Sequence, residues 1–369
     1  MSKSIKKPRS FNSLAAQNGQ GSVANSDELH RARIARLSVL KQRSTEQQRY
    51  ISEYSYHVIG DTEEGKMLNY FSKRMFDCSQ YLLFRNYYEI GLTKLVKAHT
   101  CQIHLLCAVC AHNRAARAVR AYSERFDVIR KQNPRLKPIL ITLTVKNGTD
   151  LQERFDHLRF AFGNLLDRRR DWKKKNRGFV EFCKIQGAVY SYEVTRNPKT
   201  KEWHPHIHMF ALCSDFIDRD ELIQEWHEIT QDSTVVDVRM IRSKTEIVEG
   251  KRINTGYGKA FCEVFKYAMK FSDMTPHDTL QAFCELKGKR LQDSFGLFRG
   301  IEIPEQSEDE GYDIQDQPYL ELLYKFVSKS GYNLQAVKPV QPKAGEERGG
   351  ACRPTDANDA SCMAAAVLI

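Results

Sequence analysis

Three histidines at alternate positions, His204, His206 and His208, constrain this chain more than any other feature of its sequence. Successive side chains of a β-strand point to opposite faces, so the three imidazoles would share one face and the apolar residues between them the other. Neutral imidazole is the commonest protein ligand for a divalent transition metal. The pattern predicts a half-buried strand that offers imidazoles to a metal, and residues 210–212 continue it as an apolar strand. A surface strand that carries histidines without a function is the alternative.

The residues before this segment predict a hairpin. Residues 186–196 alternate as a strand does, and residues 197–200 have the composition of a turn. This register would place Glu193 opposite His206, where its carboxylate could join the imidazoles. Such a mixed ligand set suits Mg²⁺ or Mn²⁺. A shift of one residue would turn Glu193 away. The alternatives for the third ligand are Glu202 and His204.

A second chemical motif lies in residues 260–271, whose pattern predicts an amphipathic helix with Phe261, Val264 and Phe265 on its apolar side. The other side carries a carboxylate, a phenol and two amines at helical spacing. These are Glu263, Tyr267, Lys266 and Lys270. A metal that polarises a phosphodiester, a phenol that attacks phosphorus and cations that lower the pKa of the phenol are the parts of a DNA-nicking transesterase. An ordinary amphipathic helix with a Glu–Lys pair is the alternative.

Four of the ten cysteines predict a structural zinc site. They are Cys78, Cys101, Cys107 and Cys110. Four thiolates can hold Zn²⁺ in a tetrahedron, and a C-x-x-C turn commonly supplies two of them. The apolar residues at 81–84 and 87–90 suggest a β-hairpin that joins the two halves of the site. Competing candidates for the fourth ligand are His99, His104 and His112.

A net charge of +11 indicates a polyanionic partner, because clustered Lys and Arg release counterions from nucleic acid. A predicted helix after Cys110 carries an arginine at every third position, and a dense basic run at 168–175 includes a tryptophan. Solvated surfaces are the alternative. The candidate DNA contacts are Arg114, Arg117, Arg168, Arg169, Arg170, Lys173, Lys174 and Lys175.

The order of these elements predicts an α+β chain in which an antiparallel sheet with flanking helices follows a small cysteine-rich, zinc-type module. We expect four parts. They are a basic disordered arm (1–48), the cysteine-rich module with its basic helix (49–135), the nuclease domain (136–303) and a C-terminal extension that is largely a disordered tail (304–369). The sequence has no apolar run of membrane-spanning length and no secretory signal, which predicts a cytoplasmic protein without a membrane partner.

Taken in this order, the motifs resemble the HUH endonucleases, and among them the rolling-circle replication initiators of small bacterial plasmids. The likeness covers about residues 50–300, from the cysteines through the strand at 139–144, the histidine motif and the Glu263–Tyr267 helix to the basic and apolar residues at 287–298. The resemblance implies an HUH-type fold, in which an antiparallel sheet carries the metal ligands and a nearby helix carries the nucleophile.

The resemblance also implies roles for single residues. His206 and His208 would bind the metal. Tyr267 would cut one strand at the plasmid origin, keep a 5′-phosphotyrosine link and free a 3′-OH for a polymerase that works with a host helicase. Glu263 would act as general base for the water that ends the cycle. Because the ester bond is conserved, nicking would need no ATP.

Two other classes of protein share some of these features. A histidine-triad nucleotide hydrolase also has alternating histidines, but Pro205 stands where its motif has an apolar residue, and the cysteines and the Tyr267 helix would have no role. A non-enzymatic, zinc-containing DNA-binding repressor would explain the charge and the cysteines but not the histidines. Relaxases and single-tyrosine transposases share the metal chemistry and are closer alternatives.

Overall fold

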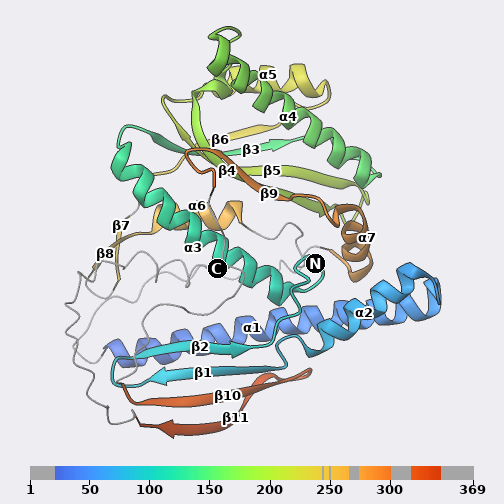
Figure 1. Cartoon of the computed structure of the whole chain (residues 1–369), viewed down its shortest axis with the longest axis vertical. Coiled ribbons are helices and arrows are strands. Elements are labelled where there is room, and N and C mark those ends of the chain that lie inside the picture. Colours follow the sequence, from blue (N-terminus) through green and yellow to red (C-terminus); the bar gives the residue numbers. More distant parts are fainter. Residues whose placement is uncertain (1–20, 243–244, 249–250, 266–273, 301–316, 342–369) are drawn as a thin grey trace, which may run out of the picture.

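The computed structural model describes residues 21–242, 245–248, 251–265, 274–300 and 317–341 (Figure 1). The described chain is α+β, with antiparallel sheets flanked by helices, as the sequence predicts. None of the helices in these ranges is long and apolar enough to cross a membrane.

The larger sheet among the described residues has five strands in the order β6-β3-β5-β4-β9, and all its pairings are antiparallel. The β4–β5 hairpin forms because the Asn197 side chain accepts hydrogen bonds from the amides of Lys199 and Thr200, which closes the turn. The strands are β3 (Lys137–Thr144), β4 (Ile185–Arg196), β5 (Trp203–Cys213), β6 (Val236–Met240) and β9 (Gln292–Gly296).

Helices cover both faces of this sheet (Figure 1). On the face of Ile207 and Met209, Phe155 and Phe162 of α4 pack against Tyr192 and Tyr190 of β4. On the histidine face, Phe210 stacks on Phe261 of α6 at 4.2 Å, and Phe126 of α3 packs edge-on against Phe210. The helices are α3 (Ala108–Gln132), α4 (Leu151–Lys175), α5 (Arg219–Thr230) and α6 (Thr255–Val264).

The prediction of a disordered arm at residues 1–48 is wrong from Gly21 onward, where the chain forms the long helix α1 (Gly21–Tyr54). The buried side of α1 includes polar residues at helical spacing, and these interrupt the apolar periodicity in the sequence. Its buried residues are Leu37, Leu40, Lys41, Ser44, Gln47 and Ile51. Residues 1–20 lie outside the described ranges.

Within the expected C-terminal extension, residues 319–340 are not a disordered tail, because they form two strands of a second sheet. Residues 304–316 and 342–369 of the extension lie outside the described ranges. The strand order of this second sheet is β11-β10-β1-β2. The cysteine-rich module therefore combines strands that precede the five-stranded sheet in the sequence with strands that follow it. Leu322 and Phe326 are buried on one face of this sheet. The predicted hairpin between Cys78 and Cys101 is present, with its turn later than expected. The strands are β1 (Tyr81–Tyr87), β2 (Leu92–Ala98), β10 (Tyr319–Val327) and β11 (Gly331–Val340).

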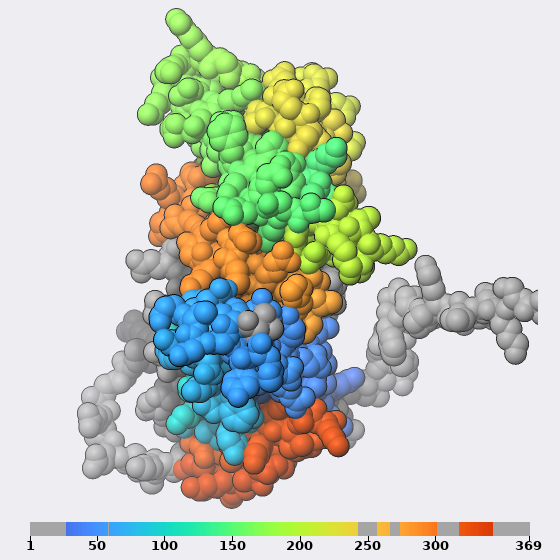
Figure 2. Space-filling model, turned by 90° about the vertical axis from the view of Figure 1, so that its right-hand side faces the viewer, coloured from blue at the N-terminus to red at the C-terminus, as the bar shows by residue number. Residues whose placement is uncertain are grey.

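Helix α7 (Pro276–Leu286) connects the module to the five-stranded sheet. The Gln47 side chain of α1 donates to the Pro276 carbonyl at 3.0 Å, and the Tyr50 hydroxyl lies 2.7 Å from Nδ1 of His277. In Figure 2 the orange α7 region lies between the blue helices of the module and the green elements around the five-stranded sheet. The remaining elements are η1 (Ser55–Ile59), α2 (Glu63–Asp77), η2 (Glu181–Lys184), β7 (Thr245–Val248) and β8 (Lys251–Asn254).

Candidate active site

Glu193, His206 and His208 form a compact group on one face of the β4–β5 hairpin. Glu193 is the direct cross-strand partner of His206, which is the register that the sequence predicts. The two Nε2 atoms lie 3.1 Å apart, and Oε2 of Glu193 lies 3.3 Å from Nε2 of His208 and 3.6 Å from Nε2 of His206. All three side chains are buried.

These distances fit a shared divalent ion. Two ligands at right angles on bonds of about 2.1 Å lie about 3.0 Å apart, and at a tetrahedral angle about 3.4 Å apart. The three measured separations are close to this range. Two imidazoles and one carboxylate suit several divalent ions, including Mn²⁺.

Hydrogen bonds at the far side of each ring orient the two imidazoles. Nδ1 of His208 lies 3.1 Å from the Thr142 hydroxyl, and Nδ1 of His206 lies 3.3 Å from the carbonyl oxygen of His204. A carbonyl can only accept, so Nδ1 of His206 donates, and in the neutral ring Nε2 keeps its lone pair for a metal. Thr142 is a residue that sequence reasoning missed. Its pairing with His208 follows from the order of the strands, which no local pattern gives.

We expect Thr142→Val to weaken Mn²⁺ binding by about 10-fold to 100-fold, because loss of a partner that orients a ligating imidazole has that effect on metal affinity. Isothermal titration of the purified full chain with Mn²⁺ measures the affinity. Thr144→Val is the matched control, since the Thr144 hydroxyl donates to the Val235 carbonyl instead of a histidine. Equal affinities for the two variants would contradict this orienting role for Thr142.

Glu193 is held in its charged form. Burial by itself would raise the pKa of the Glu193 carboxyl, but the interactions with His206 and His208 outweigh burial and hold the pKa well below its ordinary value. A carboxylate in this position supplies the negative charge that a divalent cation requires.

The other two candidates for the third ligand lie outside this group. Nδ1 of His204 lies 2.6 Å from the side-chain oxygen of Asn147, and His204 is only half-buried. The Glu202 carboxylate accepts a hydrogen bond from the Thr200 hydroxyl at 2.9 Å, within the turn. The ring of His204 lies beside that of His206, with 5.0 Å between their centroids, but of the three candidates only Glu193 brings a ligand atom into the group with the paired histidines.

The last turn of α6 is held on the histidine face of the sheet, over the row of paired residues that contains His208. Cross-strand pairing sets Ser191 of β4, His208 of β5, Thr142 of β3 and Asp237 of β6 in one row across the sheet, and paired residues share a face. The Ser191 hydroxyl donates to the carbonyl of Val264, the last residue of α6.

At the other side of this row, Arg239 of β6 lies 2.5 Å from Asp237 and 3.6 Å from the Glu263 carboxylate. The last turn of α6 is thus held by β4 and by β6, on either side of His208. Glu263 lies on this turn and is partly exposed, whereas Tyr267, Lys266 and Lys270 lie outside the described residues. Sequence reasoning missed Ser191 and Arg239, whose partners are distant in sequence.

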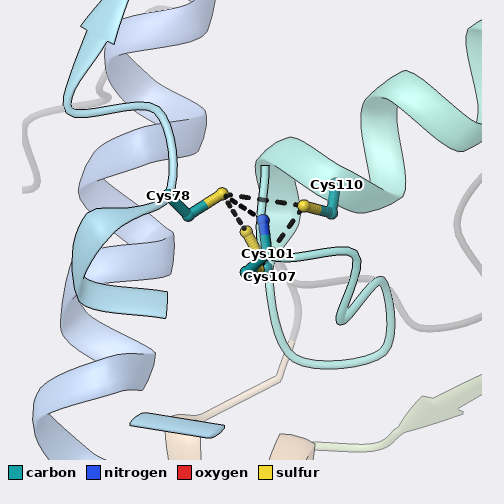
Figure 3. Close-up of side chains that lie close together, drawn as sticks. All are labelled: Cys78, Cys101, Cys107 and Cys110. Carbon is teal, nitrogen blue, oxygen red and sulfur yellow. Dashed lines mark hydrogen bonds between the residues drawn. The ribbon is translucent and has the colours of Figure 1, made fainter. Parts of the chain in front are cut away.

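The four predicted cysteines converge in the module (Figure 3). The sulfur of Cys78 lies 3.6 Å from those of Cys107 and Cys110, and the sulfurs of Cys101 and Cys110 lie 3.5 Å apart. These separations are far longer than a disulfide bond and close to the value of about 3.8 Å for thiolates around a tetrahedral zinc ion. The set of four sulfurs therefore fits Zn²⁺. The competing ligands His99, His104 and His112 are not in this group of the described residues.

The basic run at 168–175 forms the last two turns of α4. Lys173, Lys174 and Lys175 are exposed, and Arg168 and Arg170 form ion pairs with nearby acids. Arg169 is a correction to the predicted DNA contacts. It is buried, donates to the Ile185 and Gln186 carbonyls and stacks on the Phe295 ring, so it ties α4 to β4.

This run lies far from the Glu193 group. Arg169 contacts the start of β4 at Ile185, and Glu193 stands eight residues along that strand, which is roughly 25 Å. On α3, which covers the histidine face, Arg114 is exposed and Arg117 is half-buried. Any DNA contact at the basic run would therefore lie away from the Glu193 group.

Comparison with known proteins decides the family. A family model described as "Replication protein" matches residues 92–323. The chain belongs to this family. The resemblance to plasmid rolling-circle replication initiators that the sequence suggests is thereby confirmed.

Three curated relatives of this replication protein are named "Protein rep". "Protein rep" of Staphylococcus aureus is 29% identical over 203 residues, which cover 53% of this chain and 81% of the relative. "Protein rep" of a Bacillus species is 27% identical over 220 residues, which cover 55% of this chain and 67% of the relative. "Protein rep" of Streptococcus pneumoniae is 30% identical over 190 residues, which cover 49% of this chain and 55% of the relative. No solved structure matches the chain.

Proposed function

We propose that this replication protein starts rolling-circle replication by cutting one DNA strand at a plasmid origin, with Tyr267 as the nucleophile. The observation that carries the proposal is the arrangement on the histidine face. Glu193, His206 and His208 offer three metal ligands there, and the end of α6 is fixed over the same row of the sheet. In a transesterification of this kind the phosphate must lie between the metal and the nucleophile.

Chain length supports Tyr267 as the attacking residue. It follows Val264 by three residues, and three residues span at most about 11 Å. The Val264 carbonyl is bound to Ser191, the cross-strand partner of His208. A connection this short would keep Tyr267 within reach of the proposed metal site. Lys266 and Lys270 would favour the phenolate form of Tyr267 by their positive charge.

The proposed cleavage conserves the number of phosphate ester bonds. The Tyr267 oxygen forms a bond to phosphorus while the bond from phosphorus to the 3′-oxygen breaks. The phenol loses its proton, the 3′-oxygen gains one from solvent, and the product is a 5′-phosphotyrosine beside a free 3′-OH. An Mg²⁺ or Mn²⁺ ion held by Glu193, His206 and His208 would withdraw negative charge from the phosphate. A host polymerase could extend the 3′-OH while a helicase separates the strands.

Incubation of the purified full chain with labelled single-stranded origin DNA and Mn²⁺ tests this function. We expect a labelled protein band in a denaturing gel and a released strand that a polymerase can extend, and neither with excess chelator. Binding without cleavage would favour a zinc-containing repressor. Cleavage of free nucleotides without any covalent DNA product would favour a histidine-triad hydrolase.

Glu263 is proposed as the general base that activates water when the cycle ends. We expect Glu263→Ala to cut at near the normal rate but to release DNA from the tyrosine about 100-fold more slowly, within the usual range for general-base catalysis. Pulse–chase of the covalent band measures release. Because Glu263 also contacts Arg239, the matched control is Arg239→Gln, which removes the ion pair and keeps the base. Normal release by Glu263→Ala, or an equal delay in the control, would contradict the proposed role.

A further inference from the structure

Lys41 of α1 is one of the largest fully buried side chains in the described structure, with 1% of its surface exposed. Its ammonium nitrogen donates to the carbonyl oxygens of Cys78 at 2.6 Å and Phe76 at 3.3 Å. The ring of Phe326 lies on another side, at 5.7 Å. Burial of an ammonium group costs several kcal/mol unless a negative charge compensates it. These neighbours provide dipoles but no full negative charge.

Two nearby features can supply that charge, the buried cysteine group and the exposed carboxylate of Asp77. Cys78, whose carbonyl binds Lys41, is itself one of the four cysteines. With four neutral thiols, only the solvent-exposed Asp77 would oppose the charge of Lys41, whereas four thiolates around Zn²⁺ carry a net charge of about −2. Burial lowers the pKa of the Lys41 ammonium, and negative charge on Cys78, Cys107, Cys101 and Asp77 opposes this change.

A second residue of α1 contacts the same group one turn later. The Ser44 hydroxyl oxygen lies 3.5 Å from Sγ of Cys107 and accepts a hydrogen bond from the Val109 amide at 3.4 Å. Lys41 and Ser44 lie on one face of α1. Through Cys78 and Cys107, this face contacts both halves of the cysteine group. Figure 3 shows the four sulfurs of this group turned toward one another.

We propose that Lys41 is the counter-cation of a zinc tetrathiolate, so that the charge of the cysteine group controls the docking of α1. The proposal rests on zinc at these cysteines and is independent of the nicking chemistry. Gln47 and Tyr50 lie further along the same helix and contact α7. Zinc loading would thus also stabilise the contact between the module and the nuclease domain.

Lys41→Met tests this proposal, because Met has a similar length and fills the same space without a charge. We expect the variant to bind zinc at least about 10-fold more weakly, the lower end of the effect of lost partners around metal ligands. We also expect it to be more stable than the native chain when zinc is removed under reducing conditions, and less stable when zinc is bound. Competition with a chromophoric chelator gives the affinity, and denaturant unfolding gives both stabilities.

The effect of Lys41→Met on stability should have opposite signs in the zinc-free and zinc-bound chains. This change of sign distinguishes a counter-cation from a lysine with a merely structural role. A lysine that only holds α1 to two carbonyls would destabilise both forms when replaced and leave zinc affinity unchanged, and that result would overturn the proposal. Asp77→Asn is the matched control. It removes a charge beside Cys78 on an exposed side chain, and zinc affinity should stay the same. An Asp77→Asn effect as large as that of Lys41→Met would also overturn it.

Hydrogen exchange of the unmodified chain gives a test without substitution. We expect amides of α1 around Lys41 and Ser44 to exchange at least about 10-fold faster after zinc removal, because an uncompensated charge favours local opening. Equal protection with and without zinc would overturn the proposal, as would the failure of the reduced chain to bind one zinc ion at the four cysteines.

Discussion

Replacement of Tyr267 with Phe is expected to abolish the covalent protein–DNA adduct, with a loss of cleavage of at least about 10⁴-fold. The variant lacks only the oxygen that would bond to phosphorus, and removal of a nucleophile leaves only the residual effects of binding and electrostatics. DNA binding should persist, because the phosphate contacts of Lys and Arg are unaffected. A denaturing gel measures the adduct, and a mobility-shift titration measures binding.

Tyr257→Phe is the matched control for this substitution. Tyr257 is a second tyrosine of the same region, buried at the start of α6, where its ring packs against Phe126 and Arg130. We expect that variant to form the adduct at close to the native rate. An adduct that persists in Tyr267→Phe would assign the nucleophile to another residue.

Replacement of Glu193 with Gln is expected to reduce nicking at limiting Mn²⁺ by at least about 100-fold. Loss of an interaction that only orients a ligand already costs 10-fold to 100-fold in metal affinity, and Glu193 would be a ligand itself. Gln has nearly the same shape, so β4 and β5 should remain paired, and circular dichroism can verify the fold. Raising the Mn²⁺ concentration should restore part of the rate, which identifies weaker metal binding as the cause.

Glu202→Gln distinguishes the two carboxylates of the hairpin. Glu202 lies in the turn and contacts Thr200, away from the paired histidines. We expect this control to nick DNA at the native rate and to bind Mn²⁺ normally. A large loss in Glu202→Gln together with native activity in Glu193→Gln would reverse the assignment of the third ligand.

The arrangement of Glu193 and His206 could be predicted from the sequence because a short hairpin is a local structure. Once residues 197–200 are recognised as the turn, the register fixes which residues face each other. Because alternate residues of a strand share a face, His208 then lies on the same face as His206. The cysteine group could be predicted for the same reason, since a C-x-x-C turn already brings two of its sulfurs together.

The parts that were missed depend on contacts between distant segments. Helix α1 buries polar side chains such as Lys41 and Gln47, whose partners belong to the cysteine module and to α7. Strand β10 pairs with β1, more than 200 residues earlier in the chain. Arg169 looked like a DNA contact because a basic run predicts a solvated surface, but the position of α4 over Ile185 buries it. Local composition contains none of this information.

The central claim is that the Tyr267 phenol attacks a phosphate beside an ion held by Glu193, His206 and His208. Mass spectrometry of the covalent product, after digestion with trypsin and a nuclease, tests it most directly. We predict one modified peptide, in which Tyr267 carries a 5′-linked nucleotide, and we predict its absence from reactions without a divalent ion. A nucleotide attached to any other residue, or to Tyr267 in full yield without a divalent ion, would contradict this account.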